Sequence, residues 1–560
     1  MANTIDLPSP IEDLVSNDPD VFARHLEITN GKVVTRFPPE PNAHLHLGHA
    51  KAASLSYNYA KRFGGICYQR LDDTNPETAS TEYVDSILDS IKWLGFTPYK
   101  VTYASDYFDE LYDFAIQLIK SGHAYVCFQS SEEVSEYRRL KKPSPYRDTT
   151  IETNLELFER MRNGEFENGT CTLRMKMDYT SNNPNMWDLV AYRIKKVDHY
   201  RTTDKWVIYP SYDFTHAICD SLEHITHSLC TLEFETRRES YYWLLDALNL
   251  YKPYVWEFSR LNMDNSIMSK RKNLMLINNN IVEDWDDPRL VTLKGLRRRG
   301  YTPEIILEFC DRIGVTRVSD TIISYDMFEE TCRSILNEKS ERFFAVKDPL
   351  KLVITNINSS EAREYTRPKY PADPSSDNRI IRLSNILYIE KRDFRIDDSR
   401  KYFGLALNGR NDQFKWVRLR YTDLVIRVTS MDTDEDNNPI CIYCVYDETG
   451  QITKTKTAIH WVSEPHMQSI EFRDYSRLFT IQSPGSLGTI DELREALNPN
   501  SVMISTGYVE DSFADYDGEL PVQFERHGFY CIDRSDSAED SDDKLVVNLT
   551  VPLKVTKTVF

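Results

Sequence analysis

The 560-residue sequence has few cysteines and no long apolar run. Its ten cysteines are scattered along the chain, which excludes a small secreted fold framed by disulfides. No apolar run approaches the roughly 18 residues that a membrane helix needs. The first residues also lack a basic region followed by an apolar stretch, which argues against a signal peptide. We therefore expect a cytoplasmic protein without a membrane partner.

Positive charge is in deficit, because 68 Lys and Arg face 87 Asp and Glu, a formal net charge of −19. A surface with that charge spread evenly would repel nucleic acid. Acidic residues concentrate in segments 431–438, 509–520 and 533–544, which we expect to be loops. Basic residues gather in the expected helical region, at Lys270, Arg271, Lys272, Lys294, Arg297, Arg298 and Arg299. The sequence thus predicts a polarised surface and leaves a nucleic-acid partner open.

Hydrophobic patterning predicts several domains. Up to residue 120, short β-rich runs (33–37, 66–71 and 101–103) alternate with helical patterns (47–62, a helix starting near Asn75 and Pro76, and 105–120), which favours a parallel α/β sheet. The middle helix carries an apolar stripe that includes Val84, Ile87 and Ile91. Residues 123–205 break this alternation and are interpreted as an insertion, after which the α/β pattern is expected to resume near 206–209. Residues 263–340 are mainly helical, and the alternating β segments that follow predict barrels or sandwiches.

Cys441 and Cys444 form a CxxC pair inside an apolar run, 439–446, that is typical of a strand. No second CxxC and no nearby histidine pair completes a zinc site in the sequence. We interpret both cysteines as core residues and expect no protein-held metal.

Two short segments carry residues suited to phosphate binding. Residues 46–49 read His-Leu-Gly-His at the expected start of a helix, where free N–H groups and the helix dipole favour an anion. Gly48 would let a nucleotide approach the backbone closely. Residues 267–271 read Ile-Met-Ser-Lys-Arg, and a loop lysine there suits a polyphosphate clamp. Taken singly, each segment also fits ordinary packing or a solvated basic loop.

Together the two segments resemble the HIGH and KMSKS signatures of class I aminoacyl-tRNA synthetases. Further segments resemble glutaminyl-tRNA synthetases in the family's order, over about residues 30–535. They include 35–42 (Thr-Arg-Phe-Pro-Pro-Glu-Pro-Asn), 209–216 (Tyr-Pro-Ser-Tyr-Asp-Phe-Thr-His), 225–234 and 522–526 (Val-Gln-Phe-Glu-Arg). The resemblance implies an α/β fold with a Rossmann-type parallel-sheet catalytic domain and two C-terminal antiparallel β-barrels.

The resemblance also implies domain boundaries. We expect an N-terminal extension (1–29), two catalytic halves (30–106 and 211–262), an acceptor-stem-binding insertion (107–210), a helical subdomain with the KMSKS-type loop (263–340), a proximal anticodon-binding barrel (341–395 and 475–560) and a distal one (396–474).

By this resemblance the chain is expected to be a monomer that activates L-glutamine with ATP and Mg²⁺ and transfers it to tRNA(Gln). The catalytic residues would be His46, His49 and Lys270. The ATP-binding residues would be Glu40, Pro41, Asn42, His46, Leu47, Gly48, His49, Ala50, Lys51, Ala52, Thr231, Arg260, Leu261, Met268, Ser269 and Lys270. The glutamine-binding residues would be Arg36, Asp72, Tyr212, His216 and Cys230. The tRNA-binding residues would be Arg342, Arg418, Arg420, Gln523 and Arg526.

Two alternatives stay open. A glutamate–tRNA ligase of the archaeal and eukaryotic type shares much of the early sequence, but it typically has arginine where this chain has Cys230. A buried glutamate carboxylate needs a nearby cation, so a neutral Cys230 favours glutamine, unless it is a core cysteine and specificity is set elsewhere. A non-catalytic tRNA-binding relative would have lost catalytic positions, whereas His46, His49 and Lys270 are present.

The chain departs from the family pattern at a few positions. Ala43 and His44 stand where the family usually has Gly-Tyr, and His224 stands where it usually has glycine. Thr236 replaces a frequent acidic residue that contacts the acceptor stem. These departures put the local turn at His224 and the reading of the acceptor stem in doubt.

Overall fold

The computed structural model describes residues 14–318, 321–358, 363–371, 373, 375–410, 414–534 and 545–554. The chain divides into two compact units, Met1–Asn262 with Ile306–Ile323, and Met263–Ile305 with Ser324–Phe560. Within the described ranges, no helix combines the length and the hydropathy needed to cross a bilayer.

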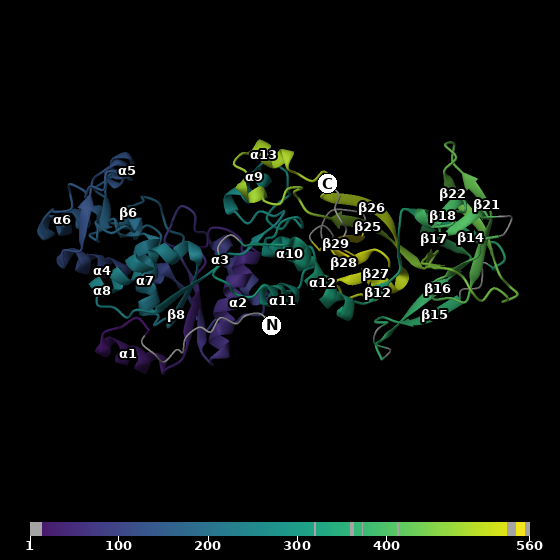
Figure 1. Ribbon diagram of the computed structural model, residues 1–560, viewed down its shortest axis with the longest axis horizontal. Coiled ribbons are helices and arrows are strands. Elements are labelled where there is room, and N and C mark those ends of the chain that lie inside the picture. Colours follow the sequence, from purple (N-terminus) through teal and green to yellow (C-terminus); the bar gives the residue numbers. More distant parts are fainter. Residues whose placement is uncertain are drawn as a thin grey trace. The chain divides into compact units, whose positions relative to one another are not determined.

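The first unit contains a parallel three-stranded sheet, whose connecting helices α2 (Leu47–Arg62) and α3 (Thr81–Trp93) are labelled in Figure 1. The strands of this sheet are β1 (Val34–Phe37), β2 (Ile66–Leu71) and β3 (Val101–Tyr103). A parallel pair, β8 (His227–Thr231) and β9 (Tyr254–Phe258), lies beside it, because Thr226 exchanges hydrogen bonds with Val34 at 2.8 to 3.0 Å. The predicted alternation of strands and helices and the parallel sheet are therefore confirmed.

Capping residues decide where the helices of this sheet begin. The sequence predicted that α3 starts near Asn75 and Pro76, but it starts at Thr81. The hydroxyl of Ser80 accepts a hydrogen bond from the Tyr83 backbone N–H, so Ser80 is the N-cap. On the helix itself, the predicted apolar stripe, including Val84, Ile87 and Ile91, is buried.

An antiparallel sheet with the order β4-β5-β6-β7 follows and is packed against helices. Its elements are α4 (Phe108–Lys120), β4 (Ala124–Cys127), α5 (Ser131–Arg139), α6 (Ile151–Arg162), β5 (Thr172–Met175), β6 (Val190–Ile194) and β7 (Ile208–Pro210). The expectation that the parallel α/β pattern resumes at 206–209 was wrong, because β7 pairs with β6 in this antiparallel sheet. The parallel pattern resumes one element later, at α7 (Tyr212–Leu222) and β8.

The remaining elements outside the C-terminal sheets are short strands and helices. They are α1 (Pro19–Thr29), α8 (Arg238–Ala247), β10 (Asn262–Met263), α9 (Lys270–Asn278), α10 (Leu293–Arg298), α11 (Pro303–Ile313), β11 (Ile322–Ile323), α12 (Tyr325–Lys339) and α13 (Ile490–Glu495). In the second unit, α9 and α13 share a buried apolar cluster that includes Ile267, Leu276 and Leu493. The segment that carries the KMSKS-like loop therefore packs on a segment some 200 residues later in the chain.

Two seven-stranded sheets, largely antiparallel, make up most of the second unit. The first has the order β12-β27-β28-β29-β25-β26-β13 and the second β23-β20-β21-β22-β14-β17-β24. The strands, with two additional hairpins or pairs, are β12 (Arg342–Phe343), β13 (Ala345–Lys347), β14 (Pro349–Ile354), β15 (Arg363–Pro368), β16 (Asn378–Leu383), β17 (Ile386–Glu390), β18 (Phe394–Asp397), β19 (Leu405–Asn408), β20 (Val417–Leu419), β21 (Val425–Thr433), β22 (Pro439–Tyr446), β23 (Ala458–Ile459), β24 (Val462–Ser463), β25 (Met467–Tyr475), β26 (Val502–Glu510), β27 (Val522–Phe524), β28 (Gly528–Ile532) and β29 (Leu545–Pro552). The expected C-terminal antiparallel sheets are thus present. In the second sheet, β14 pairs with β17 and with β22, which belongs to residues 417–463. In the first sheet, β25 pairs with β26.

The CxxC pair lies on β22, where Cys444 is buried and Cys441 is partly exposed. Both thiols are free. Residues three apart on a strand point to opposite faces, so the two sulfur atoms do not converge on one ion.

Charged residues are placed differently from the expectation of acidic loops and a basic surface. Glu510, at the end of β26, is buried and accepts a hydrogen bond from Arg379 at 2.5 Å. Asp533 is buried against Arg298, and Arg299 is 1% exposed and donates to backbone carbonyls. The interpretation of Glu510 as a loop acid and of Arg298 and Arg299 as surface cations was wrong, because a buried charge must find a partner within the fold. Asp533 lies outside the strands as expected but is buried, and the acidic residues 434–436 lie in an exposed turn as expected. Residues 535–544 lie outside the described residues.

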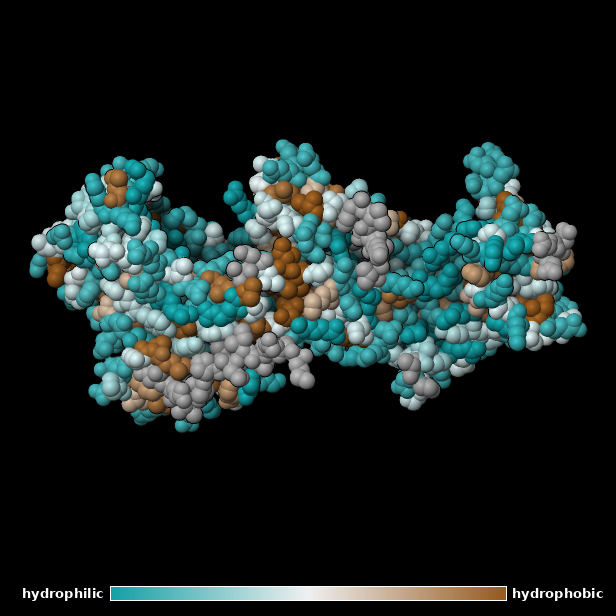
Figure 2. All heavy atoms as spheres, in the orientation of Figure 1, coloured by the Kyte–Doolittle hydropathy of each residue, from teal (hydrophilic) through white to brown (hydrophobic). Residues whose placement is uncertain are grey.

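On the face of the molecule seen in Figure 2, hydrophobic side chains form small separate patches in a largely hydrophilic surface. Such scattered apolar residues are usual for a folded chain and mark no binding site by themselves.

Candidate active site

A cavity of about 720 Å³ lies in the first unit, at the carboxyl ends of β1, β2 and β8 and at the starts of α2 and α7. This is the edge at which parallel α/β sheets bind ligands. Fourteen of the residues proposed from the sequence line it, namely Arg36, Glu40, His46, Gly48, His49, Lys51, Ala52, Asp72, Tyr212, His216, Cys230, Thr231, Arg260 and Leu261.

The two histidines at the start of α2 have fixed hydrogen-bonding roles. His46 is the N-cap, and its Nδ1 accepts a hydrogen bond from the Gly48 N–H at 3.1 Å. The Nδ1 of His49 accepts one from the His46 N–H at 3.2 Å. Burial, followed by the nearby Arg260, lowers the pKa of His49 to about 4, and burial likewise lowers the pKa of His46. Each ring is therefore neutral with its proton on Nε2, a donor suited to phosphate oxygens.

Other groups surround the helix start. The Lys51 ammonium is buried and donates to the Ser259 carbonyl at 3.3 Å, and burial lowers its pKa. Arg260 forms an ion pair of 2.8 Å with Glu233. The hydroxyl of Thr231 lies 3.5 Å from the same carboxylate. The N–H groups of Gly48, His49 and Ala50 all bond to His46, so the helix contributes its dipole here rather than free donors. Cations, the neutral imidazole donors and the positive end of the helix dipole thus converge at the start of α2.

Seven of the proposed ATP-binding residues do not line the cavity. Leu47 and Ala50 are fully buried and face the core, because the helix turns their side chains away from its open end. Pro41 and Asn42 lie in the preceding turn but outside the lining. Met268, Ser269 and Lys270 belong to the second unit, at the start of α9.

Asp72 follows β2 and faces the cavity. Its Oδ1 is buried and has no hydrogen-bond partner in the described part of the chain. Burial raises the pKa of the Asp72 carboxyl to about 7, an effect that Arg70 offsets only in part. A cation bound beside Asp72 would supply the missing partner.

Arg36 lies at the other end of the cavity and is fully buried. Its guanidinium forms a two-oxygen ion pair with Asp220, at 3.0 and 3.2 Å, and donates to the Leu229 carbonyl at 2.8 Å. Burial alone would lower the pKa of Arg36, but Asp220 raises it above its usual value, so the side chain stays charged. Asp220 also pairs with Arg70. The charge of Arg36 is therefore compensated inside the protein.

Small neutral groups separate this ion pair from the cavity. The Nη2 of Arg36 lies 2.9 Å from the His216 Nε2 and 3.3 Å from the Cys230 Sγ. Burial lowers the pKa of His216 to about 3, so the ring is neutral and its Nε2 accepts from Arg36. Tyr212 stacks on His216 with ring centroids 4.9 Å apart. Its hydroxyl is protonated, because burial raises its pKa. This end of the cavity thus presents neutral polar groups.

The structure adds residues that the sequence did not single out. Arg193, on β6 of the antiparallel sheet, lines the cavity, and its Nε is buried without a hydrogen-bond partner among the described residues. Asp220 forms an ion pair with the Arg36 guanidinium, and the Ser228 hydroxyl accepts a hydrogen bond from it. No spacing in the sequence links these residues, since Asp220 is 184 positions from Arg36.

Of the five residues proposed to bind tRNA, Arg342, Arg418 and Gln523 lie on strands of the two C-terminal sheets, and Arg420 and Arg526 lie in the turns after β20 and β27. Arg342 and Gln523 are register partners on the parallel pair β12 and β27. Arg526 has φ of 72° and forms a double ion pair with Asp393, at 2.6 and 2.8 Å. The structure therefore brings Arg342 and Gln523 together.

The remaining two arginines have partners within the protein. Arg418 donates to the carbonyls of Asp423 and Thr453, at 3.2 and 3.0 Å. Arg420 pairs with Glu525 at 2.7 Å.

The departures from the family pattern are accommodated locally. His224 has φ of 51°, a conformation that glycine adopts more easily, and its ring lies 5.6 Å from that of His25 on α1. His44 Nδ1 lies 2.6 Å from the Ser86 hydroxyl. The Thr236 hydroxyl accepts a hydrogen bond from Asn185 at 3.0 Å. His224, His44 and Thr236 thus each contact a neighbouring side chain.

Three stretches of the chain match known domain families. Residues 32–338 match the catalytic domain of tRNA synthetases class I (E and Q). Residues 340–447 and 458–533 match two anticodon-binding domains of the same class. The catalytic match alone covers more than half of the chain, which therefore belongs to the class I tRNA synthetases.

Similar proteins identify the family within this class to which the chain belongs. A probable glutamine–tRNA ligase of Dictyostelium discoideum is 47% identical over 559 residues, covering 99% of this chain and 69% of that protein. A glutamine–tRNA ligase of Lupinus luteus is 48% identical over 547 residues, covering 96% and 67%. One from Haemophilus influenzae (strain 86-028NP) is 46% identical over 544 residues, covering 94% and 95%. Within its class, the chain is a member of the glutamine–tRNA ligase family.

Proposed function

We propose that this chain is a glutamine–tRNA ligase, which uses ATP to activate L-glutamine and transfers it to the terminal adenosine of tRNA(Gln). The observation that carries the substrate assignment is the neutral end of the cavity around Cys230, where Arg36 is already compensated by Asp220. A ligase for glutamate would need an uncompensated cation there. Family membership and the glutamine–tRNA ligases among its relatives support the same choice.

The nucleotide is proposed to bind at the start of α2. There the helix dipole and the Nε2–H groups of His46 and His49 would favour a phosphate. In the first step the glutamine carboxylate attacks the α-phosphorus in line, and pyrophosphate leaves. Both histidines would stabilise charge as neutral donors, without proton transfer.

Lys270, with Met268 and Ser269, is proposed to bind the phosphates of ATP. The support is the KMSKS-like sequence and the family match, and Lys270 is the first residue of α9. An ammonium near the β- and γ-phosphates would stabilise the leaving pyrophosphate.

Magnesium is proposed to arrive with the nucleotide. Of the four carboxylates that line the cavity, Glu233 and Asp213 are already paired with Arg260 and Arg237, and Asp72 is the proposed partner of the α-ammonium, which leaves Glu40 alone. The described lining therefore does not form a protein cage for Mg²⁺, and phosphate oxygens would supply its ligands.

Glutamine is proposed to lie between Asp72 and Cys230. Asp72 would accept its α-ammonium, and Tyr212 would orient the side-chain amide. Arg193 also faces the cavity, and its place on β6 suits the 3′ end of a tRNA or the pyrophosphate as partner.

The rest of the chain is proposed to bind tRNA as one monomer. The insertion 107–210 would grip the acceptor end, and the two C-terminal sheets would form the proximal and distal anticodon-binding barrels. Arg342 and Gln523, which lie side by side, are the first candidates for contacts to splayed bases. Arg418, Arg420 and Arg526 would have to exchange internal partners for RNA.

The test of this function is a parallel charging assay with purified tRNA and labelled glutamine or glutamate. We expect glutamine to be charged at least about 10²-fold faster, because a pocket without a free cation must bury an unpaired carboxylate to accept glutamate. Preferential charging of glutamate would contradict the substrate assignment. Binding of tRNA without charging of either amino acid would contradict the enzymatic function.

The pKa of Asp72 predicts how activity depends on pH. The raised pKa of about 7 means that the carboxyl is protonated below pH 7, and only the carboxylate binds an ammonium group. We therefore expect kcat/KM for glutamine to be flat above pH 8 and to fall about tenfold per pH unit below pH 6. A series of charging rates at subsaturating glutamine measures this profile. An Asp72→Asn variant should be slow throughout and lose the slope, and the prediction fails if the slope persists in that variant.

A further inference from the structure

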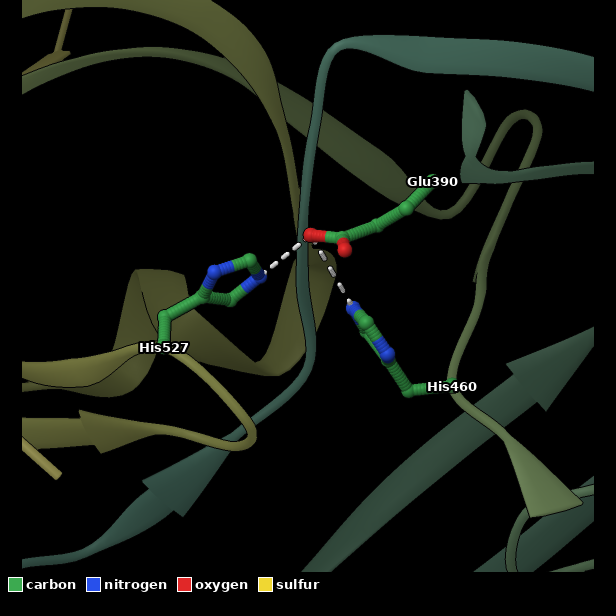
Figure 3. Close-up of side chains that lie close together, drawn as sticks. All are labelled: Glu390, His460 and His527. Atoms are coloured by element: carbon green, nitrogen blue, oxygen red, sulfur yellow. Dashed lines mark ion pairs between the residues drawn. The ribbon is translucent and has the colours of Figure 1, made fainter. Parts of the chain in front are cut away.

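Three side chains of the second unit converge where the two C-terminal sheets meet (Figure 3). Glu390 ends β17, His460 lies between β23 and β24, and His527 lies in the turn between β27 and β28. Their potential ligand atoms all lie within 4.8 Å of one another. Strands β17, β23 and β24 belong to one sheet and β27 and β28 to the other, so the cluster links both sheets.

The facing atoms of this cluster are buried and poorly satisfied. The side chains of Glu390, His460 and His527 are 4%, 0% and 7% exposed. The Glu390 Oε1 lies 2.6 Å from the His527 Nε2 and 3.8 Å from the His460 Nε2, as ion-pair contacts. Within the described ranges, both carboxylate oxygens and both Nε2 atoms lack a hydrogen-bond partner of good geometry. Four such atoms in one place are costly unless something else satisfies them.

We propose that Glu390, His460 and His527 bind one divalent transition-metal ion, with zinc as the best fit. Two imidazoles and one carboxylate are the donor set of a zinc site that keeps a water molecule as fourth ligand. Bonds of about 2.0 to 2.1 Å place two ligands of a tetrahedral ion about 3.3 Å apart. The contact of 3.8 Å is close to this value, and the contact of 2.6 Å has to open by about 0.7 Å.

The surroundings leave the ligands within reach of solvent. Glu390 and His527 line a cavity of about 800 Å³, which provides an entry path. Arg392 also pairs with Glu390, but its side chain is 59% exposed and can turn to solvent when an ion takes the carboxylate.

A neighbouring ion pair contacts one of the proposed ligands. Arg526 is fixed by Asp393 and lies 2.8 Å from the His460 Nδ1, on the side of the ring opposite to the cluster. An ion on Nε2 requires the ring proton on Nδ1, so Arg526 has to give up this contact when the ion binds. The bound ion would thus be a structural link between the two sheets, next to a residue proposed to contact tRNA. This role is independent of the chemistry in the first unit.

The test uses the full chain without an affinity tag, stripped of metal by a chelator and titrated with zinc chloride by calorimetry. We expect one tight site in the parent chain, and binding weaker by about 100-fold or more in a His527→Gln variant. A His466→Gln variant is the matched control, because His466 lies in the same unit and pairs with Asp511 at 3.4 Å outside the cluster. Zinc should raise the melting temperature of the parent chain and the control by a few degrees, and that of His527→Gln much less.

Cobalt distinguishes this site from the ten cysteines. Bound to nitrogen and oxygen ligands, Co²⁺ should show tetrahedral d–d bands without thiolate charge-transfer absorption. Equal zinc affinity of the parent chain and His527→Gln, or a cobalt spectrum dominated by thiolate, would overturn the proposal. If His527→Gln does not fold, crystals of the zinc-treated parent chain decide the matter. An anomalous peak at the cluster at the zinc edge supports the site, and its absence contradicts it.

Discussion

Replacing Cys230 with arginine is expected to lower kcat/KM for glutamine by about 10³-fold and to raise the ratio of glutamate to glutamine charging by at least about 10²-fold. The new guanidinium would enter the neutral end of the cavity, beside the Arg36 Nη2, which lies 3.3 Å from the present sulfur atom. Asp220 already balances Arg36 and Arg70. The added charge therefore finds its compensation in the carboxylate of a glutamate substrate. Parallel charging assays with both labelled amino acids measure the two quantities.

The matched control is Cys230→Ser, which keeps a small neutral group at this position. We expect it to charge glutamine within about tenfold of the parent rate and to gain no activity with glutamate. Melting temperatures of both variants show whether the fold survives. Should Cys230→Arg charge glutamine as fast as the parent chain, Cys230 does not face the substrate amide and the specificity lies elsewhere.

Replacing Lys270 with alanine is expected to slow formation of the glutaminyl-adenylate by about 10² to 10³-fold, because it removes a cation from the leaving pyrophosphate. The affinity for tRNA should change little, since the proposed RNA contacts lie elsewhere in the chain. The rate of pyrophosphate release in a single turnover, with tRNA present, measures the first effect. Filter binding of labelled tRNA measures the second.

Lys272→Ala provides the comparison for Lys270. Lys272 lies two residues after Lys270 on the same helix. Its ammonium donates to the Gly485 carbonyl, so it has a structural partner. We expect it to retain most of the parent rate. Unchanged pyrophosphate release in Lys270→Ala, or an equal loss in Lys272→Ala, would argue against a specific role for Lys270 at the phosphates.

Local patterns in the sequence were sufficient for the catalytic α/β core. The helix at residues 47–62 and the strands at 66–71 and 101–103 appear with the predicted bounds. Their apolar periodicity, caps and turns depend only on residues close in the chain, which is why the prediction succeeded. The antiparallel strand β7 was misassigned because periodicity does not say which partner a strand will pair with.

Only part of the candidate site could be predicted from the sequence. Motif residues such as His46, Asp72 and Cys230 were named from the resemblance, and the fold brings them to one cavity. Their chemical state came from the structure, because it depends on burial and on neighbours. The raised pKa of Asp72 is an example, as is the compensation of Arg36 by a carboxylate 184 positions away.

The deficit of positive charge also shows which properties the sequence determined and which the tertiary structure decided. By itself the sequence determined that acids outnumber bases, that no apolar run is long enough for a membrane, and that an ordered set of motifs marks a tRNA synthetase. Only the tertiary structure decided that Glu510 and Asp533 are buried partners of arginines, and that Glu390, His460 and His527 meet. The reason is that desolvation and pairing act between residues joined by the fold, whatever their separation along the chain.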